Sequence, residues 1–202
     1  MKPWTDADLQ AFLRVIDPDD NATGGGTASA VAGAMAAGLV GMVARVSKGK
    51  PDLESDEFYA TIDTAAQELT RDLMQGGRED SEAFGAVMRA FTLPKCTEDE
   101  VRARRDSIRA AMVEATRVPL ENAKRCMRVL ELADRVLARF NENAASDLAC
   151  ARALACTGAE GCLENVEINL PGVKDEQAKA DFEDQSNELR SVYAVLRGGT
   201  DG

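Results

Sequence analysis

Residues 23–47 read TGGGTASAVAGAMAAGLVGMVARVS and carry the strongest structural signal in the chain. Within this stretch Gly33, Ala37 and Gly41 recur every four residues. Residues at this spacing share one face of a helix, and small side chains on that face let a second helix approach closely. We therefore expect a buried Ala/Gly-rich helix that starts at about Thr27 and lies at the centre of a bundle or at a dimer seam.

The same stretch is a poor candidate for a membrane span. Its longest apolar run, residues 28–44, consists mainly of Ala and Gly rather than Leu and contains Ser29. The run is shorter than the roughly 20 residues needed to cross a bilayer. We expect a buried helix and no membrane contact.

The segments around this stretch also have helical patterns. Thr5 is a natural N-cap for an amphipathic helix that ends near residues 17–18, and a polar loop then leads to the glycines. Pro119 is expected to kink or restart a long later helix, and Ser146 is expected to cap the next one. The remaining expected helices cover residues 57–91, from residue 97 onward, 146–169 and 175–196, with a loose tail at residues 198–202.

Signals for strands and for domain boundaries are missing from the sequence. Long alternating runs of β-branched residues do not occur, and Pro and aromatic residues are scarce. No long linker or internal repeat divides the chain. The sequence therefore predicts an all-α fold, a single multi-helix bundle domain of about six to eight helices over residues 1–202.

The composition excludes several classes of function. The chain has 202 residues and a formal net charge of −11, which argues against binding nucleic acid or an anionic membrane. It has no histidine, so imidazole acid–base chemistry and histidine-containing metal sites are excluded. Its five cysteines form no CxxC pair, which disfavours a disulfide framework and a zinc site. The first residues lack the basic and then apolar pattern of a signal peptide, so we expect a cytoplasmic location.

Two short motifs are candidates for binding and catalysis. Gly24, Gly25 and Gly26 precede a helix N-terminus, where free N–H groups and the helix dipole favour a phosphate or carboxylate. The same glycines are also typical of a tight turn between helices. Asp80 lies where the charged run REDSE gives way to AFGAV. Its carboxylate is therefore either an acid–base group with a raised pKa or a solvated surface charge.

Polar residues in the second half of the chain, together with one lysine, form another candidate set. Asn143 and Asp147 lie in NAASD, and Asn165 and Asn169 are four residues apart in NVEIN, so the last two share a helix face. These groups fit a substrate site, and they fit helix caps and interhelical hydrogen bonds equally well. Lys50 is one of several basic positions that either attract an anionic substrate or are solvated surface.

Further motifs follow these in order along the chain. They are TGGGTASAVAGAMAAGLVGMVARVS at 23–47, DSEAF at 80–84, AFTLPK at 90–95, ATRVPL at 115–120, NAASDLACA at 143–151 and NVEIN at 165–169, with Asp175 after them. Each motif alone is weakly specific, whereas the whole set in register is strongly specific. In this order, over nearly the whole chain, it resembles the formimidoyltetrahydrofolate cyclodeaminase / methenyltetrahydrofolate cyclohydrolase family.

The resemblance implies a homodimeric all-α bundle that acts on a tetrahydrofolate derivative as its substrate. It implies no tightly bound cofactor, metal or nucleotide, and it makes Asp80 the catalytic carboxylate. Gly24, Gly25, Gly26 and Lys50 become candidates for binding the glutamate carboxylates of the folate.

The same resemblance makes Asn143 and Asp147 candidates for orienting the pterin or the attacking atom, and it adds Asn165 and Asn169 to the folate-binding set. A formiminotransferase or a folate dehydrogenase is the expected pathway neighbour. Cyclodeaminase and cyclohydrolase activities need the same constellation, so both stay open.

Two departures from the family pattern leave other functions open. Thr23 stands where the family usually has Pro, and KGKPDL at residues 48–53 replaces the usual IGKKKY. The second change loses two basic positions and a Tyr but keeps Gly49 and Lys50. A family member with an altered substrate is therefore one alternative. The other is a non-catalytic helical assembly protein, whose small-residue helix and polar caps serve only packing.

Overall fold

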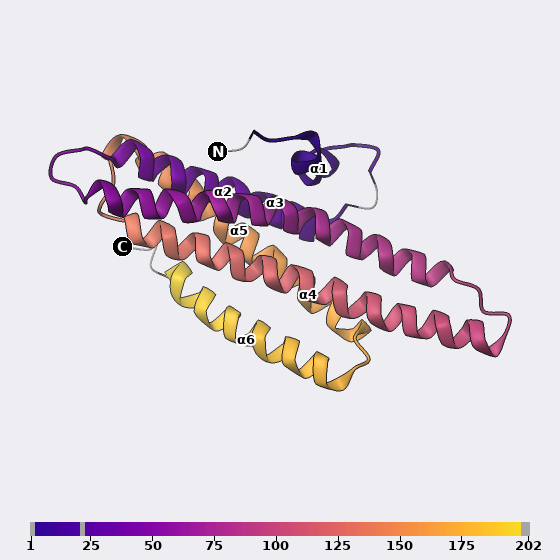
Figure 1. Cartoon of the computed structure of the whole chain (residues 1–202). Helices are drawn as coiled ribbons and strands as arrows, with labels where there is room; N and C mark the ends of the chain where they lie inside the picture. The colour runs from indigo at the N-terminus through magenta and orange to yellow at the C-terminus, as the bar shows by residue number, and fades with distance from the viewer. Residues whose placement is uncertain (1–2, 21–22, 199–202) are drawn as a thin grey trace.

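Every regular element is a helix in the part of the chain that the computed structural model describes, residues 3–20 and 23–198 (Figure 1). The predicted all-α fold is confirmed, while residues 199–202 of the predicted loose tail lie outside the described residues. The α-helices are α1 (Asp6–Val15), α2 (Gly25–Ser47), α3 (Asp56–Thr92), α4 (Glu98–Val136), α5 (Ala145–Asn169) and α6 (Glu176–Gly198), with 3₁₀ turns at Glu142–Ala144 and Leu170–Gly172.

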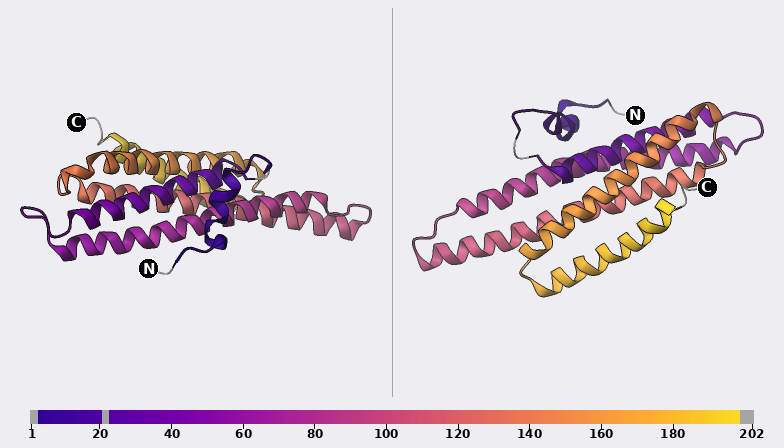
Figure 2. Two further views of the ribbon diagram at one scale, coloured as in Figure 1. Left: turned by 90° about the horizontal axis from the view of Figure 1, so that it is seen from above. Right: turned by 180° about the vertical axis from the view of Figure 1, so that it is seen from behind.

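Helix α2 is the central element, as its small-residue face predicts. It packs between α3 and α5 (Figure 2). At Gly33 the approach is so close that an added Cβ would lie 2.5 Å from Sγ of Cys126 and 3.2 Å from Cδ1 of Leu73. The helix starts earlier than expected, at Gly25 with Gly24 as its N-cap, so the glycines form part of its first turn instead of a loop before it.

Helix α2 is also long and apolar enough, by length and composition, to cross a membrane. Within the bundle, 72% of its most apolar window is buried. Burial by protein on this scale is the environment of a core helix.

Helices α3 and α4 form a long antiparallel hairpin. They contain 37 and 39 residues, and each begins at a side-chain cap, Ser55 for α3 and Thr97 for α4. Their connected ends project beyond α2 and α5 in all three views (Figures 1 and 2). The apolar residues on this projection, such as Met88 and Phe91, are therefore exposed.

Of the two effects expected of Pro119, a kink or a restart of the helix, the restart does not occur. Helix α4 runs without interruption from Glu98 to Val136. A proline has no N–H, so the carbonyl of Ala115 loses its usual donor four residues later. The side-chain amide of Asn169 donates to that carbonyl at 2.7 Å. A side chain of α5 thus satisfies the backbone group that Pro119 leaves free.

The start of α5 also differs from the expectation that Ser146 caps it. A 3₁₀ turn, Glu142–Ala144, leads directly into the helix, whose N-cap is Ala144. Ser146 lies inside the first turn, so the predicted cap is wrong. Asn141 caps the 3₁₀ turn, because its side chain accepts the N–H of Asn143 at 3.2 Å.

Candidate functional site

Asp80 lies in a cavity of about 420 Å³ at the N-terminal end of α2. This size is within the range of small-molecule sites. The wall combines polar groups from the start of α2 and from α5 with apolar side chains from α3, α4 and α5. The lining residues are Thr23, Gly24, Gly26, Asp80, Phe84, Val87, Met112, Ala115, Asn165, Ile168 and Asn169.

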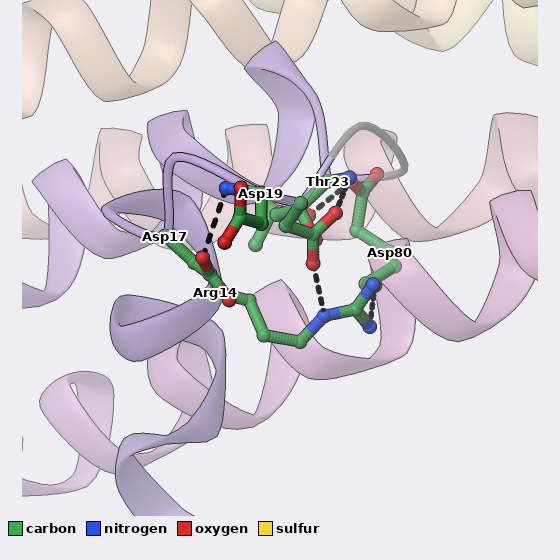
Figure 3. Close-up of polar contacts among 8 residues, drawn as sticks. Arg14, Asp17, Asp19, Thr23 and Asp80 are labelled. Carbon is green, nitrogen blue, oxygen red and sulfur yellow. Dashed lines mark hydrogen bonds and ion pairs between the residues drawn. The ribbon is translucent and has the colours of Figure 1, made fainter.

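The carboxylate of Asp80 reaches the first turn of α2, beside the segment that carries Thr23 (Figure 3). The hydroxyl of Thr27, which is fully buried, donates to Oδ2 of Asp80 at 2.8 Å. An added Cβ at Gly26 would lie 2.7 and 2.8 Å from the two carboxylate oxygens. The carboxylate therefore occupies space that a side chain at position 26 would fill.

Burial raises the pKa of Asp80 above its usual value of 3.8. Hydrogen bonds from the side chain and the backbone N–H of Thr27 act in the opposite direction, because they stabilise the ionised form. Desolvation is the larger effect. A carboxyl group whose pKa moves toward neutrality is better suited to exchange protons with a substrate.

Asn165 and Asn169 reach the cavity from the same face of α5, as their spacing predicts. The amide of Asn169 donates to the carbonyl of Ala115 at 2.7 Å and contacts Oδ1 of Asn165 at 3.3 Å. Asn169 therefore has both of the roles that the sequence left open. It makes an interhelical hydrogen bond to the backbone of α4, and it lines the cavity.

Glycines 24 and 25 border open space. An added Cβ at either position meets nothing within 4 Å. The N–H groups of the first turn of a helix have no acceptor inside the helix, and that of Thr27 serves Asp80. The N–H groups of Gly25 and Gly26 are thus suited to an anionic or carbonyl group of a ligand.

The apolar wall continues to the rim of the cavity. Phe84 and Ile168 are 45% and 76% exposed, and Val87 and Met112 lie beside them on the wall. Large apolar side chains this open to solvent at the mouth of a cavity are typical of a binding site for a flat or apolar ligand.

The structure does not bring the other predicted site residues to Asp80 within one chain. Lys50 follows the far end of α2, which at 1.5 Å per residue is about 34 Å long. Asp147 precedes Asn165 by about three quarters of the length of α5, about 27 Å. Lys50 and Asn143 instead line a separate pocket with neighbours such as Phe140.

Sequence reasoning missed several residues of the cavity. Thr27 carries a signal that points to its role, since it follows the glycines and lies in the first turn of α2. Phe84 is one helical turn after Asp80 within the same motif. Met112 and Ile168 have no local signal, because they reach the site through the packing of α4 and α5. Among residues 3–20 and 23–198, no group of three or more Cys, Asp or Glu side chains forms a candidate metal site.

Comparisons with known proteins show which family this chain resembles over most of its length. The chain is 35% identical to a methenyltetrahydrofolate cyclohydrolase of Methylorubrum extorquens, over 92% of this chain and 88% of that protein. It is 29% identical to the formimidoyltransferase-cyclodeaminase of Rattus norvegicus over 86% of this chain, and it spans 32% of that longer protein. A crystal structure of formiminotetrahydrofolate cyclodeaminase from Thermotoga maritima superposes with a TM-score of 0.79 at 26% identity, covering 93% of this chain and 90% of that one.

The family model described as formiminotransferase-cyclodeaminase matches residues 8–188, which include the whole cavity. The chain belongs to the formiminotransferase-cyclodeaminase family.

Proposed function

We propose that this protein is a folate-dependent one-carbon enzyme that acts at a C–N bond of a tetrahydrofolate derivative. The observation that carries the proposal is the partly buried carboxylate of Asp80, which lies at the N-terminus of α2 with a raised pKa and faces a cavity of about 420 Å³. The names of the relatives supply the substrate class. The reaction is methenyltetrahydrofolate cyclohydrolysis or formimidoyltetrahydrofolate cyclodeamination.

Asp80 can serve the same purpose in either reaction. In the cyclohydrolase reaction, Asp80 takes a proton from water as the oxygen attacks the methenyl carbon. It returns that proton to N5 as the C–N5 bond breaks, while the hydroxyl of the tetrahedral intermediate releases its own proton to solvent and becomes the formyl carbonyl of 10-formyltetrahydrofolate. In the cyclodeaminase reaction, Asp80 takes the N10 proton as N10 closes onto the formimidoyl carbon, and a proton passes to the nitrogen that leaves as ammonia. A carboxyl group with a raised pKa suits both the uptake and the return.

The chemistry of the remaining cavity wall suits such a substrate. Phe84 and Ile168 provide apolar surface for the ring system, while Asn165 provides a hydrogen-bonding group beside Asp80. The N–H groups of Gly25 and Gly26 can donate hydrogen bonds to a carboxylate or a ring carbonyl of the substrate. This division into polar and apolar walls favours an enzyme over a non-catalytic assembly protein.

Two spectrophotometric assays test the proposal. Loss of the absorbance of 5,10-methenyltetrahydrofolate identifies a cyclohydrolase, which the relative at 35% identity favours. Formation of that absorbance from 5-formimidoyltetrahydrofolate identifies a cyclodeaminase, which the structural relative favours. Asp80→Asn should lower the rate by about 10²-fold or more in the active assay while the protein stays folded. Silence of the wild-type protein in both assays would support an altered substrate and overturn the proposed reactions.

We also propose that the enzyme is a homodimer paired through α2. One apolar face of α2 lies at the outside of the bundle. Met35 and Val46 on this face are exposed, and Leu39 and Met42 are partly buried. A second copy crossing α2 in the opposite direction would cover this apolar face. With a two-fold axis near the middle of the helix, Lys50 of one copy comes beside the N-terminal end of α2 in the other.

This pairing would bring Lys50, Asn143 and Asp147 of one copy toward the Asp80 cavity of the other, whereas within one chain they lie far from it. A complementation assay tests it: Asp80→Asn and Lys50→Ala subunits are each impaired, but a mixed dimer regains one intact site of two. Random mixing should recover about a quarter of the wild-type activity. Recovery no greater than the sum of the separate variants, or a monomeric mass in solution, would contradict this arrangement.

The wider setting is part of the same proposal. A formiminotransferase that supplies a formimidoyl substrate, or a folate dehydrogenase that exchanges the methenyl compound, is the expected neighbour in a cytoplasmic pathway. Co-purification of such an activity with the protein is the corresponding measurement.

A further inference from the structure

Helix α1 contributes little apolar packing, yet it carries an arginine that reaches the neighbourhood of Asp80. Ala11 is the buried residue of α1, and it lies against Gly77 of α3. Arg14, near the end of α1, donates from Nη1 to Oγ of Ser81 at 2.5 Å. Ser81 is buried and directly follows Asp80 in α3.

The same guanidinium holds the loop before α2 (Figure 3). Nε of Arg14 donates to Oδ2 of Asp20 at 2.7 Å, and the side chain of Asp20 is only 10% exposed. Asp20 in turn accepts the N–H of Thr23 at 2.8 Å and its hydroxyl at 2.9 Å. A sheltered carboxylate that accepts several hydrogen bonds holds its partners more firmly than an exposed ion pair does.

We propose that Arg14 and Asp20 are positioning residues that hold Thr23 and Gly24 at the wall of the Asp80 cavity. Both held residues line the cavity and immediately precede α2. Any ligand bound by the first turn of α2 meets a wall whose position depends on this chain of contacts.

Two attachments then join the N-terminal end of α2 to consecutive residues of α3. Thr27 is tied directly to Asp80, and Thr23 is tied to Ser81 through the intervening carboxylate and guanidinium. One attachment fixes the distance between two helices, whereas a second one beside it also fixes their orientation. A site whose groups are held in place before the ligand arrives binds it with a smaller loss of conformational entropy.

The proposal also accounts for the threonine at position 23, where the motifs that this sequence resembles usually have proline. A proline has no N–H and no hydroxyl, so it cannot make either hydrogen bond to Asp20. Thr23 makes both. The threonine at this position thus makes a pair of hydrogen bonds to Asp20 that a proline could not make, and we call this pair the anchor.

The first test measures the anchor without any assay of activity. Hydrogen exchange of the Thr23 amide should become at least about tenfold faster in Asp20→Ala, because its acceptor is removed. Thr23→Val, which keeps the N–H and loses the hydroxyl, should show a smaller change. Asp99→Ala is the matched control, since Asp99 forms an exposed ion pair with Arg102. An unchanged exchange rate in Asp20→Ala overturns the proposal.

The second test asks whether the anchor serves the site, and this kinetic test rests on the proposed function. Arg14→Gln and Asp20→Ala should raise KM by about tenfold and leave kcat within about twofold, whereas Arg102→Gln should change neither. Arg14→Lys keeps the charge but not the fork of donors, so its KM should lie between those of wild type and Arg14→Gln. Unchanged KM values in an active enzyme overturn the positioning role.

Trp4 distinguishes a positioning role from simple detachment of α1. It is the single tryptophan of the chain, and the guanidinium of Arg71 lies 4.8 Å from the centre of its ring. Its emission should be the same in Arg14→Gln and wild type. A red shift of the emission, with kcat and KM both altered, would show that α1 has left the bundle and would refute a specific role for Arg14. If the wild-type protein is inactive in both folate assays, the proposed function fails and the exchange measurement still decides whether the anchor exists.

Discussion

Replacing Gly26 by Ala tests the closest approach in the proposed site. The added Cβ would lie 2.7 and 2.8 Å from the carboxylate oxygens of Asp80 and 3.0 Å from Cγ of Asn165. Nonbonded carbon contacts are comfortable at about 3.5 Å or more, so the carboxylate or α2 must move by roughly 0.7 Å. We expect the free energy of unfolding to fall by about 1 to 3 kcal/mol, the usual cost of overpacking.

Gly25→Ala is the matched control. Gly25 is in the same first turn of α2, and its added Cβ meets nothing within 4 Å. A glycine-to-alanine change without a clash stabilises a helix by about 0.4 to 1 kcal/mol. In a protein of this size 1 kcal/mol shifts Tm by about 2 to 4 °C, so Gly26→Ala should lower Tm by about 2 to 12 °C while Gly25→Ala leaves it equal or higher.

A double-variant cycle assigns the loss to the carboxylate. In an Asp80→Ala background only the 3.0 Å contact with Cγ of Asn165 remains, so Gly26→Ala should cost less, and most of the loss of about 1 to 3 kcal/mol should appear as coupling free energy. Displacing the carboxylate should also lower turnover of the folate substrate by about 10²-fold. Equal melting temperatures for Gly25→Ala and Gly26→Ala, or no coupling to Asp80, would refute the contact.

Three further predictions concern the pH dependence of stability, the hydrogen bond to α4 and the packing of α2. Because the folded pKa of Asp80 lies above 3.8, the folded protein holds a proton that the unfolded chain has released, and stability falls as pH rises through the folded pKa. Asp80→Asn lacks this titration, so the Tm of the variant minus the Tm of the wild type should increase from below pH 3.8 to neutral pH. A difference that stays constant with pH would contradict the raised pKa. Asn169→Ala should cost about 1 to 3 kcal/mol by leaving the carbonyl of Ala115 unpaired, and Pro119→Ala should reduce that loss in denaturant titrations by restoring a backbone donor. Gly33→Leu should destabilise the protein by about 1 to 3 kcal/mol, and an unchanged Tm and mass would count against close packing at this position.

The helices and the acid–base candidate were accessible from local pattern. Periodic apolar residues and caps such as Thr5 and Thr97 indicate helices, because each helix is stabilised by interactions three or four residues apart. The place of Asp80 between a charged run and an apolar one makes it a candidate, and the resemblance of DSEAF to the family motif selects it. Asn165 and Asn169 were placed on one face by their spacing alone.

Other features follow only from contacts between residues far apart in the chain. Pro119 was expected to disturb its helix, and nothing near it in the sequence reveals that Asn169, on another helix, donates to the carbonyl that it leaves free. The hydrogen bond from Arg14 to Ser81 joins residues 67 positions apart. No local rule predicts such pairs, since they depend on how whole helices pack.

Local order along the chain therefore established that the protein is helical and where its helices lie to within a turn. It left Asp80 open between an acid–base group and a surface charge, and the family resemblance made it the catalytic candidate. Packing established that the carboxylate of Asp80 is partly buried against Gly26 with its pKa raised, and that Lys50 lies at the opposite end of α2. The physical reason is range: hydrogen bonds and side-chain spacing within a helix act over three or four residues. Desolvation and the distance between groups depend on every element that surrounds them.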